Sequence, residues 1–333
     1  MIQIKKKSIV YVQAPSHYFS GGPLALHQLA YKLRKMSINA VMYYNPKVKD
    51  NPVNTNFKKY KLPYVFEIAD NSENVLIISE FNTSIIFKFK NIKKAIWWLS
   101  IDNYFKGHEF LKKSIKNKFL SFFKMFNFFD LNNSEQLNLD IFHLAQSKYA
   151  YTYLKNKKIK NLNYLHCYLD EKFNNISYDL NSKQDIVAYN PKKGIKFTKE
   201  IIKRFHNSKI KFVPVQNMSI SEVQELLLKS KIYIDFGNHP GRDRFPREAA
   251  LFGCSIITNK KGSAKNKLDV NIPEEYKFQD ESELEFNKII DLIKEITVNF
   301  RLHHDNFNSY RNTILNDEKR FDLELKKVFF KNE

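Results

Sequence analysis

The sequence alternates between short apolar, β-branched runs and longer amphipathic runs, and it does so twice along the chain. The short runs are typical of buried strands, whereas apolar residues recur at helical spacing in the longer ones. Strands that alternate with helices form parallel sheets covered on both faces, so the pattern predicts an α/β protein. The expected strands lie at 8–15, 39–45, 74–80, 94–102, 141–147, 185–191, 210–216, 232–237 and 254–259, and the expected helices at 23–36, 148–158, 195–207, 219–231 and 245–253.

The alternation lapses around residues 173–184, where Asn, Ser and Asp replace the periodic apolar residues. A chain of 333 residues is long for one core and suits two domains of about 150 residues each. We predict two Rossmann-like doubly wound domains that face each other across a cleft. The N-terminal domain would span 1–172 and the C-terminal domain 185–315, joined by the linker 173–184 and followed by a C-terminal helix at 316–333. Ligands of such sheets bind beyond the carboxyl ends of the strands.

The chain carries 55 Lys and Arg residues against 35 Asp and Glu, a net charge of +20. Such a charge indicates a nucleic acid, an anionic membrane or an anionic substrate as partner, or else the lysine-rich composition of a low-GC genome. Cys167 and Cys254 belong to no C-x-x-C pair and predict buried, reduced thiols. No apolar run approaches the ~18 residues of a spanning helix. We therefore expect a cytoplasmic protein, peripheral at most on the inner face of the cytoplasmic membrane.

Residues 235–258, DFGNHPGRDRFPREAALFGCSIIT, follow an expected strand and contain the start of a helix at Pro246. Helix N-termini attract anions, and arginine holds phosphate with a bidentate fork. A carboxylate beside such a site accepts the hydroxyls of a ribose, so the stretch predicts a nucleotide site. The alternative is a surface cluster of salt bridges to Asp243 and Glu248. The candidate binding residues are Gly237, His239, Gly241, Arg242, Arg244, Arg247 and Glu248.

The end of this stretch, REAALFGCSIIT, resembles the E-A-x-A-x-G-x-P-V-I signature of the GT-B glycosyltransferases. In that superfamily the glutamate at the position of Glu248 binds the ribose of a nucleotide-sugar donor. The chain also resembles bacterial glycosyltransferases of capsule and O-antigen clusters. The resemblance implies transfer of a sugar to a glycan or lipid-linked acceptor. Ser255 stands in place of the signature proline, and Pro240 stands where many retaining members have a second glutamate, so the stereochemical outcome stays open.

Two other loops match the resemblance. Lys192 and Lys193 follow the first strand of the second half, where family members bind the donor diphosphate, and Lys260 and Lys261 are similar candidates. The loop SHYFSGG contributes His17, Gly21 and Gly22 as acceptor or phosphate contacts before a helix. It is not a G-x-G-x-x-G loop, which disfavours a nicotinamide cofactor. We expect no cofactor apart from the nucleotide-sugar substrate.

Glu80 and Asp102 stand at the ends of two expected strands of the first half. A carboxylate there can deprotonate an acceptor hydroxyl, with Asp102 the first candidate and Glu80 the second. The alternative for either is a helix cap or a structural hydrogen bond. The nine histidines form no H-x-x-x-H or H-E-x-x-H pair and no D-x-D follows a strand. We therefore expect no metal site and a metal-independent reaction.

Residues 104–131 interleave phenylalanines with lysines. As a helix this segment would suit a membrane interface, and the alternative is an ordinary amphipathic core helix. Two rival functions remain from the sequence. A nucleotide-sugar 2-epimerase shares the GT-B fold and needs no acceptor. A basic nucleic-acid-binding protein would explain the charge, but no such motif occurs in the sequence, so we expect no nucleic-acid partner.

Overall fold

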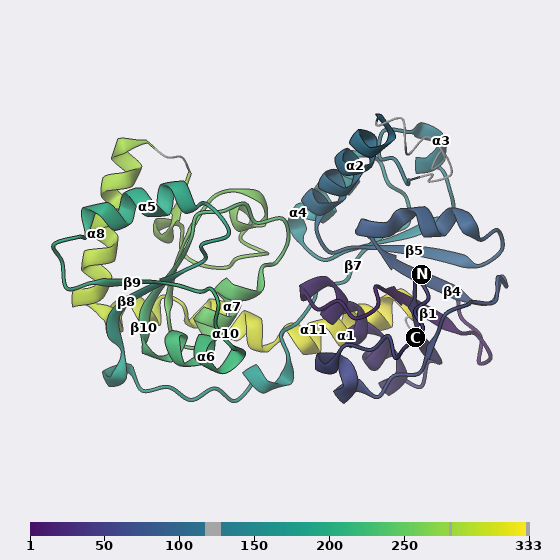
Figure 1. The fold of residues 1–333 in the computed structure, drawn as a ribbon, viewed down its shortest axis with the longest axis horizontal. Helices are drawn as coiled ribbons and strands as arrows, with labels where there is room; N and C mark the ends of the chain where they lie inside the picture. The colour runs from purple at the N-terminus through teal and green to yellow at the C-terminus, as the bar shows by residue number, and fades with distance from the viewer. Residues whose placement is uncertain (117–127, 280–281, 331–333) are drawn as a thin grey trace. The chain divides into compact units, whose positions relative to one another are not determined.

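The computed structural model describes residues 1–116, 128–279 and 282–330 (Figure 1). Contacts divide the chain into two compact units. Unit 1 comprises Met1–Cys167 and Lys319–Glu333, and unit 2 comprises Tyr168–Glu318. Each unit is built around its own parallel sheet, so the predicted α/β class with two doubly wound domains is confirmed.

Among the described residues of unit 1, seven parallel strands pair in the order β3-β2-β1-β4-β5-β6-β7. Every residue of β1 is buried, so both faces of the sheet are covered there. The strands are β1 Val10–Ala14, β2 Ala40–Tyr44, β3 Tyr64–Val65, β4 Val75–Ser79, β5 Lys93–Trp98, β6 Ile141–Ala145 and β7 Leu162–Tyr164. The helices are α1 Gly21–Lys35, η1 Thr55–Tyr60, η2 Glu80–Lys88, α2 Ile101–Lys116, α3 Ser134–Leu137 and α4 Lys148–Asn156.

In the described part of unit 2, five parallel strands pair in the order β12-β11-β10-β8-β9. All of β11 is buried, which again indicates cover on both faces. The strands are β8 Gln184–Tyr189, β9 Lys211–Pro214, β10 Ser230–Asp235, β11 Ser255–Asn259 and β12 Lys277–Phe278. The helices are η4 Glu171–Phe173, η5 Leu180–Ser182, α5 Ile195–Arg204, α6 Ile220–Lys229, α7 Arg244–Leu251, η6 Gly262–Lys265, η7 Glu274–Tyr276, α8 Glu283–Val298, α9 Phe300–Asp305 and α10 Asn308–Leu315.

Local sequence signals account for several helix starts. Pro23 and Pro246 lie in the first turns of α1 and α7, where a missing backbone N–H leaves no helical bond unmade. Ser219 caps α6: its hydroxyl accepts from the backbone of Glu222, whose carboxylate accepts from the backbone of Ser219. This reciprocal pair satisfies two N–H groups that the helix itself cannot, and it fixes where α6 begins.

The polar segment 173–184, expected as a linker, lies within unit 2 and is anchored there by Lys183. The Lys183 ammonium is buried and donates to three backbone carbonyl oxygens, those of Leu227 (2.9 Å), Ser230 (2.9 Å) and Phe252 (2.6 Å). These carbonyls lie at or beside the C-termini of α6 and α7, where a cation is favoured. A lysine in a polar run therefore ties the segment to the core of unit 2.

The expected C-terminal helix, 316–333, corresponds to α11 (Asp317–Phe329), which belongs to unit 1 from Lys319 onward. Its apolar face is buried, and the ring of Phe321 lies 6.1 Å from that of Trp97 in β5. The backbone of Ile2 donates to that of Val328, which ties the start of the chain to the same helix. Apolar packing thus explains why the last helix joins the first unit.

The Phe- and Lys-rich segment 104–131 is described at 104–116 and 128–131, and residues 117–127 lie outside the described part. At its two ends Tyr104 and Phe129 are buried, and the Tyr104 hydroxyl donates to the Phe129 carbonyl. These two residues therefore serve the core of unit 1. Within residues 1–116, 128–279 and 282–330, no helix combines the length and the hydropathy needed to cross a membrane.

Candidate functional site

Three loops meet at the carboxyl edge of the unit 2 sheet, after β8, β10 and β11. A Cβ at Gly237 would lie 2.1 Å from Lys193 Cβ, and a Cβ at Gly194 would lie 2.5 Å from the backbone of Phe236. Gly194 also has φ of +59°, which favours glycine. Asn259, at the end of β11, donates to the carbonyls of Phe236 and Gly237. The glycines that the sequence concentrates here are therefore explained by close approach of these loops.

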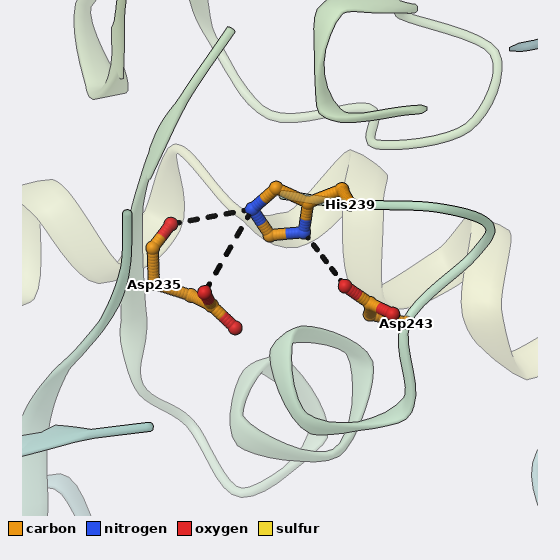
Figure 2. Close-up of side chains that lie close together, drawn as sticks. All are labelled: Asp235, His239 and Asp243. Carbon is orange, nitrogen blue, oxygen red and sulfur yellow. Dashed lines mark hydrogen bonds and ion pairs between the residues drawn. The ribbon is translucent and has the colours of Figure 1, made fainter. Parts of the chain in front are cut away.

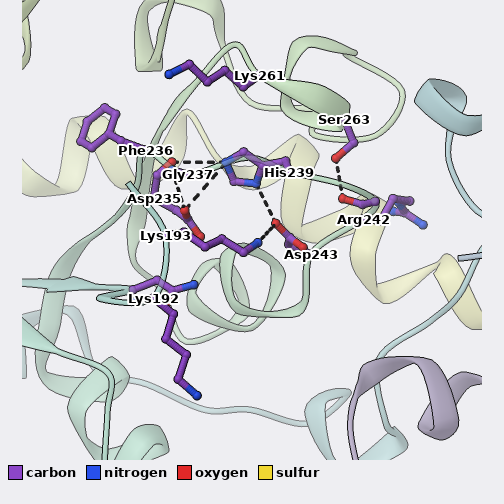
Figure 3. Close-up of polar contacts among 12 residues, drawn as sticks. Lys192, Lys193, Asp235, Phe236, Gly237, His239, Arg242, Asp243, Lys261 and Ser263 are labelled. Atoms are coloured by element: carbon purple, nitrogen blue, oxygen red, sulfur yellow. Dashed lines mark hydrogen bonds and ion pairs between the residues drawn. The ribbon is translucent and has the colours of Figure 1, made fainter. Parts of the chain in front are cut away.

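Between these loops a chain of polar contacts runs from Asp235 to Lys193 (Figures 2 and 3). His239 is 1% exposed; its Nε2 lies 3.2 Å from the backbone oxygen of Asp235, and its Nδ1 lies 2.9 Å from Oδ2 of Asp243. The same Asp243 oxygen accepts from Lys193 Nζ at 2.6 Å. A single carboxylate thus joins a buried histidine to a lysine at the edge of the sheet.

The electrostatics of this chain follow from burial and pairing. Burial alone would lower the pKa of His239, but the bond to Asp243 and the charge of Asp235 raise it above the usual histidine value. Burial would likewise raise the pKa of Asp243, but its contacts with His239 and Lys193 hold it below the usual range. For Asp235 burial prevails and its pKa is raised. We expect charged His239, Asp243 and Lys193 to stabilise one another.

In the described part of the chain, Asp235, His239 and Asp243 are also the group whose ligand atoms come together closely enough to hold a metal ion, all within 4.8 Å. We did not predict this set from the sequence, although residues 235–243 have the spacing D-x-x-x-H-x-x-x-D. The histidine and the lysine both contact the same Asp243 oxygen, and a nearby ammonium repels a cation. We interpret the group as a hydrogen-bonded network, and metal independence stays a prediction.

The charged residues at the start of α7 fall into two groups. Glu248 is buried and its carboxylate pairs with Nε of Arg244, the arginine of this stretch that remains 32% exposed. Arg242 and Arg247 are 0% and 2% exposed, and both pair with Oδ2 of the buried Asp317, at 2.9 and 3.4 Å. The sequence led us to expect that Arg242 and Arg247 contact phosphate. In the structure they instead cross-link the loop before α7, and α7 itself, to the start of α11. Because Asp317 lies 70 residues further along, the stretch itself does not reveal this partner.

The remaining candidate residues of unit 2 lie in the loops after β8 and β11 and before α7. Lys192 and Lys193 are adjacent, but Figure 3 shows the Lys192 side chain pointing away from the cluster that Lys193 joins. Lys260 pairs with Glu274 at 2.9 Å. The carbonyl of Gly241 accepts from the Ser263 hydroxyl, which fixes the loop before α7. Lys193, directly before the N-terminus of α5, is therefore the lysine best placed to meet an anion.

In unit 1 the candidate carboxylates also lie at the carboxyl edge of the sheet. Glu80 is 4% exposed, and its carboxylate accepts from the backbone N–H of Leu99 at 2.9 Å. Burial raises the pKa of Glu80 to about 7, although backbone N–H groups partly oppose the rise. Asp102, in the first turn of α2, accepts from the Tyr149 hydroxyl at 2.9 Å. Glu80 and Asp102 thus each accept a structural hydrogen bond, which was the alternative to a catalytic role. Their role as a base stays a prediction.

The glycine-rich loop of unit 1 lies near the same edge. Gly21 and Gly22 open α1, and a Cβ at Gly22 would lie 3.7 Å from the Leu99 side chain, next to Glu80. His17 lies 3.3 Å from Asp50, in the loop after β2. The structure therefore brings Gly22 and Glu80 into one neighbourhood and joins His17 to a different loop.

Known structures resemble the whole chain. A sucrose-phosphate synthase from Thermosynechococcus elongatus matches with a TM-score of 0.61 at 12% identity, over 97% of this chain and 98% of that one. HepE from Anabaena, in complex with UDP-glucose, matches with 0.59 at 11% identity over 96% and 98%. A glycosyltransferase from Rickettsia africae matches with 0.58 at 15% identity over 97% and 98%. The chain has the GT-B fold.

The structural comparison thus confirms the GT-B fold that the sequence resemblance predicts. No family model and no curated protein matches the sequence. The agreement covers nearly the full length of both chains, so it includes both units and not a shared Rossmann-like half alone. The identities of 11–15% are those of a common fold.

Proposed function

We propose that this GT-B protein is a glycosyltransferase that binds a nucleotide-activated sugar in unit 2 and transfers the sugar to an acceptor bound by unit 1. The observation that carries the proposal is the carboxyl edge of the unit 2 sheet. There Lys193, the N-terminus of α5 and the Arg244–Glu248 pair are supplied by loops that follow neighbouring strands. An anion site beside a carboxylate suits a nucleoside diphosphate. HepE, which has the same fold, binds UDP-glucose.

Each group would have a distinct part in donor binding. Lys193 and the first N–H groups of α5 would neutralise the diphosphate, and Glu248 would accept from the ribose hydroxyls. When the acceptor oxygen bonds to the anomeric carbon, the bond from that carbon to the diphosphate oxygen breaks. Negative charge then grows on the leaving nucleotide, where fixed cations and N–H groups stabilise it. In an inverting reaction Asp102 or Glu80 would take the acceptor proton.

The acceptor we propose is a glycan or lipid-linked glycan of a bacterial surface polysaccharide, met at the inner face of the cytoplasmic membrane. The charge of unit 1 supports an anionic partner. The residues of unit 1 include 31 Lys and Arg against 13 Asp and Glu, a net charge of +18. Such a field attracts anionic lipid or lipid-linked diphosphates.

The test is a thermal-shift screen against UDP, GDP, CMP, dTDP and their sugars, followed by calorimetric titration. A ligand at ~100 times its Kd should stabilise the protein by about 2.7 kcal/mol. Glu248→Gln keeps the volume of the side chain but removes its charge, so we expect binding about tenfold weaker, in line with loss of a charged hydrogen bond. If no nucleotide shifts the melting temperature, the donor role of unit 2 is wrong; wild-type affinity in Glu248→Gln removes Glu248 from the ribose site.

A further inference from the structure

The polar chain from Asp235 to Lys193 becomes steadily more accessible toward the edge of the sheet. The side chains of Asp235 and His239 are each 1% exposed, that of Asp243 is 20% exposed and that of Lys193 28%. Figure 3 shows the dashed contacts that lead from Asp235 through His239 to Asp243 and on to the Lys193 ammonium. A buried arrangement thus ends at a cation that solvent and ligands reach.

The histidine at its centre faces an acceptor on each side. A neutral imidazole carries a hydrogen on one nitrogen, and its other nitrogen needs a donor. Here one nitrogen faces the Asp235 carbonyl and the other the Asp243 carboxylate, and both are acceptors. The doubly protonated ring therefore satisfies both contacts, so His239 is a fixed cation with a fixed orientation. Its bond to Asp243 is charge-assisted, and such bonds are the stronger kind.

Fixing Asp243 also fixes Lys193. A lysine side chain has four rotatable bonds, and holding it in one conformation costs up to about 2 kcal/mol of entropy. The bond to Asp243 uses one of the three hydrogens on Nζ and leaves two for phosphate oxygens. The stem of Lys193 is held as well, since it packs where Gly237 has no Cβ. A lysine held in this way meets the diphosphate without a further ordering cost.

We propose that His239 is a positioning residue of the donor site: it holds Asp243, and Asp243 holds the Lys193 ammonium where the donor diphosphate binds. His239 itself touches no substrate. The inference rests on the proposed function, because it assumes that unit 2 binds a nucleotide sugar.

Two conservative variants separate the two bonds of the ring. In His239→Asn the amide nitrogen lies where Nδ1 lay and still donates to Asp243. In His239→Gln the amide nitrogen lies where Nε2 lay, so the bond to Asp235 is kept and the bond to Asp243 is lost. We expect His239→Asn to bind within about threefold of wild type and His239→Gln about tenfold more weakly, the loss of one charge-assisted bond. A residue that only fills space would not distinguish the two.

A double-mutant cycle then shows whether the effect passes through Lys193. We expect Lys193→Ala to weaken binding at least as much as His239→Gln. Adding His239→Gln to Lys193→Ala should change affinity by less than about twofold, since coupled residues are not additive. Lys199→Ala is the matched control, because it removes an exposed lysine of α5 that the network does not hold, and it should bind almost as wild type does.

Calorimetric titration of the full chain with UDP-glucose, UDP-N-acetylglucosamine, GDP-mannose and dTDP-glucose carries the test, with melting temperatures to confirm that each variant folds. Equal loss in the Asn and Gln variants, or full additivity with Lys193→Ala, would contradict the inference while leaving the proposed function intact. Binding that EDTA abolishes and Mn²⁺ restores would also contradict it and make the cluster a metal site. If wild type binds none of the four sugars, the proposed function itself is wrong.

Discussion

The two units share a doubly wound parallel architecture but differ in their balance of basic and acidic residues. Unit 1 has 31 Lys and Arg and 13 Asp and Glu, whereas unit 2 has 24 and 22. In proportion to their lengths the two units are about equally rich in basic residues, and the difference lies in the acids. A genome-wide lysine bias acts on both units alike, so the scarcity of acids in unit 1 needs another explanation. The anionic partner proposed for unit 1 would provide that explanation.

Individual carboxylates of the two units also differ in what they contact. In unit 2, Asp243, Glu248 and Asp317 each pair with a cationic side chain. In unit 1, Glu80 accepts from backbone N–H groups and its pKa rises to about 7. Cationic side chains thus balance these three carboxylates of unit 2, whereas backbone N–H groups contact Glu80.

The largest effect should come from Asp317→Asn. This change leaves Arg242 and Arg247 buried without their shared carboxylate, which should cost about 3–5 kcal/mol. Denaturant unfolding followed by circular dichroism measures the loss. Both tryptophans, Trp97 and Trp98, lie in unit 1, so their fluorescence should change less than the overall signal.

Glu200→Gln is the matched control for this prediction, because it breaks the exposed pair between Glu200 and Lys203. Such surface pairs contribute about 0–1 kcal/mol. If Asp317→Asn were as mild as the control, Arg242 and Arg247 would have no structural role and would return as candidates for the phosphate site.

The second effect concerns the charge of unit 1. Replacing Lys112, Lys113 and Lys116 with Glu should weaken binding to vesicles of anionic lipid by at least about 3 kcal/mol, since each lysine near such a surface contributes about 1 kcal/mol and each new glutamate is repelled. The binding of wild type should fade as salt rises. Sedimentation with vesicles at low and high salt is the measurement.

The same charge change placed in unit 2 controls for overall electrostatics. Lys199, Lys209 and Lys211 are exposed there, and their replacement with Glu should leave sedimentation nearly unchanged. If both triple variants lost vesicle binding equally, the total charge of the protein, and not the charge of unit 1, would determine that binding. If the wild-type protein did not sediment with anionic vesicles at low salt, the membrane part of the proposal would be refuted.

The third effect is the pH dependence of unit 1. The pKa of Glu80 is raised to about 7 in the folded protein, so between its unfolded value and pH 7 the folded state holds more protons than the unfolded state. Stability should then fall as pH rises through this window, by roughly 3 kcal/mol in total. The difference in unfolding free energy between wild type and Glu80→Gln, followed by tryptophan fluorescence from pH 4.5 to 8, should show this slope. A flat difference would mean that Glu80 is charged throughout.

Much of the fold could be predicted from the sequence because strand and helix signals are local. The periodicity around β1 and α1, Pro23 and the cap at Ser219 all act within a few residues. The loops that form the candidate site were also predictable, since strand ends of a parallel sheet meet at one edge. Lys193 and Glu248 were named in those loops, and their roles came from the resemblance to the GT-B glycosyltransferases.

The partners of those residues were not predictable, because they depend on contacts between distant segments. Asp317 reaches Arg242 across 75 residues, and Asp243 reaches Lys193 across 50. Glu80 accepts a hydrogen bond from the backbone N–H of Leu99, and a pattern of side chains does not predict a bond to the backbone. Residue types at strand ends therefore indicate where a site lies, whereas pairing decides which charges remain available to a ligand.

Hydrogen–deuterium exchange with and without the best-binding nucleotide sugar tests the central claim, that unit 2 carries the donor site, most directly. Bound ligand protects the backbone that it contacts or orders. We predict that the largest slowing falls in peptides covering 190–199 and 236–249, around Lys193, His239 and Glu248, with smaller changes in peptides covering 80–104 of unit 1. Slowing concentrated in unit 1, with residues 190–199 and 236–249 unchanged, would contradict the assignment of the donor to unit 2.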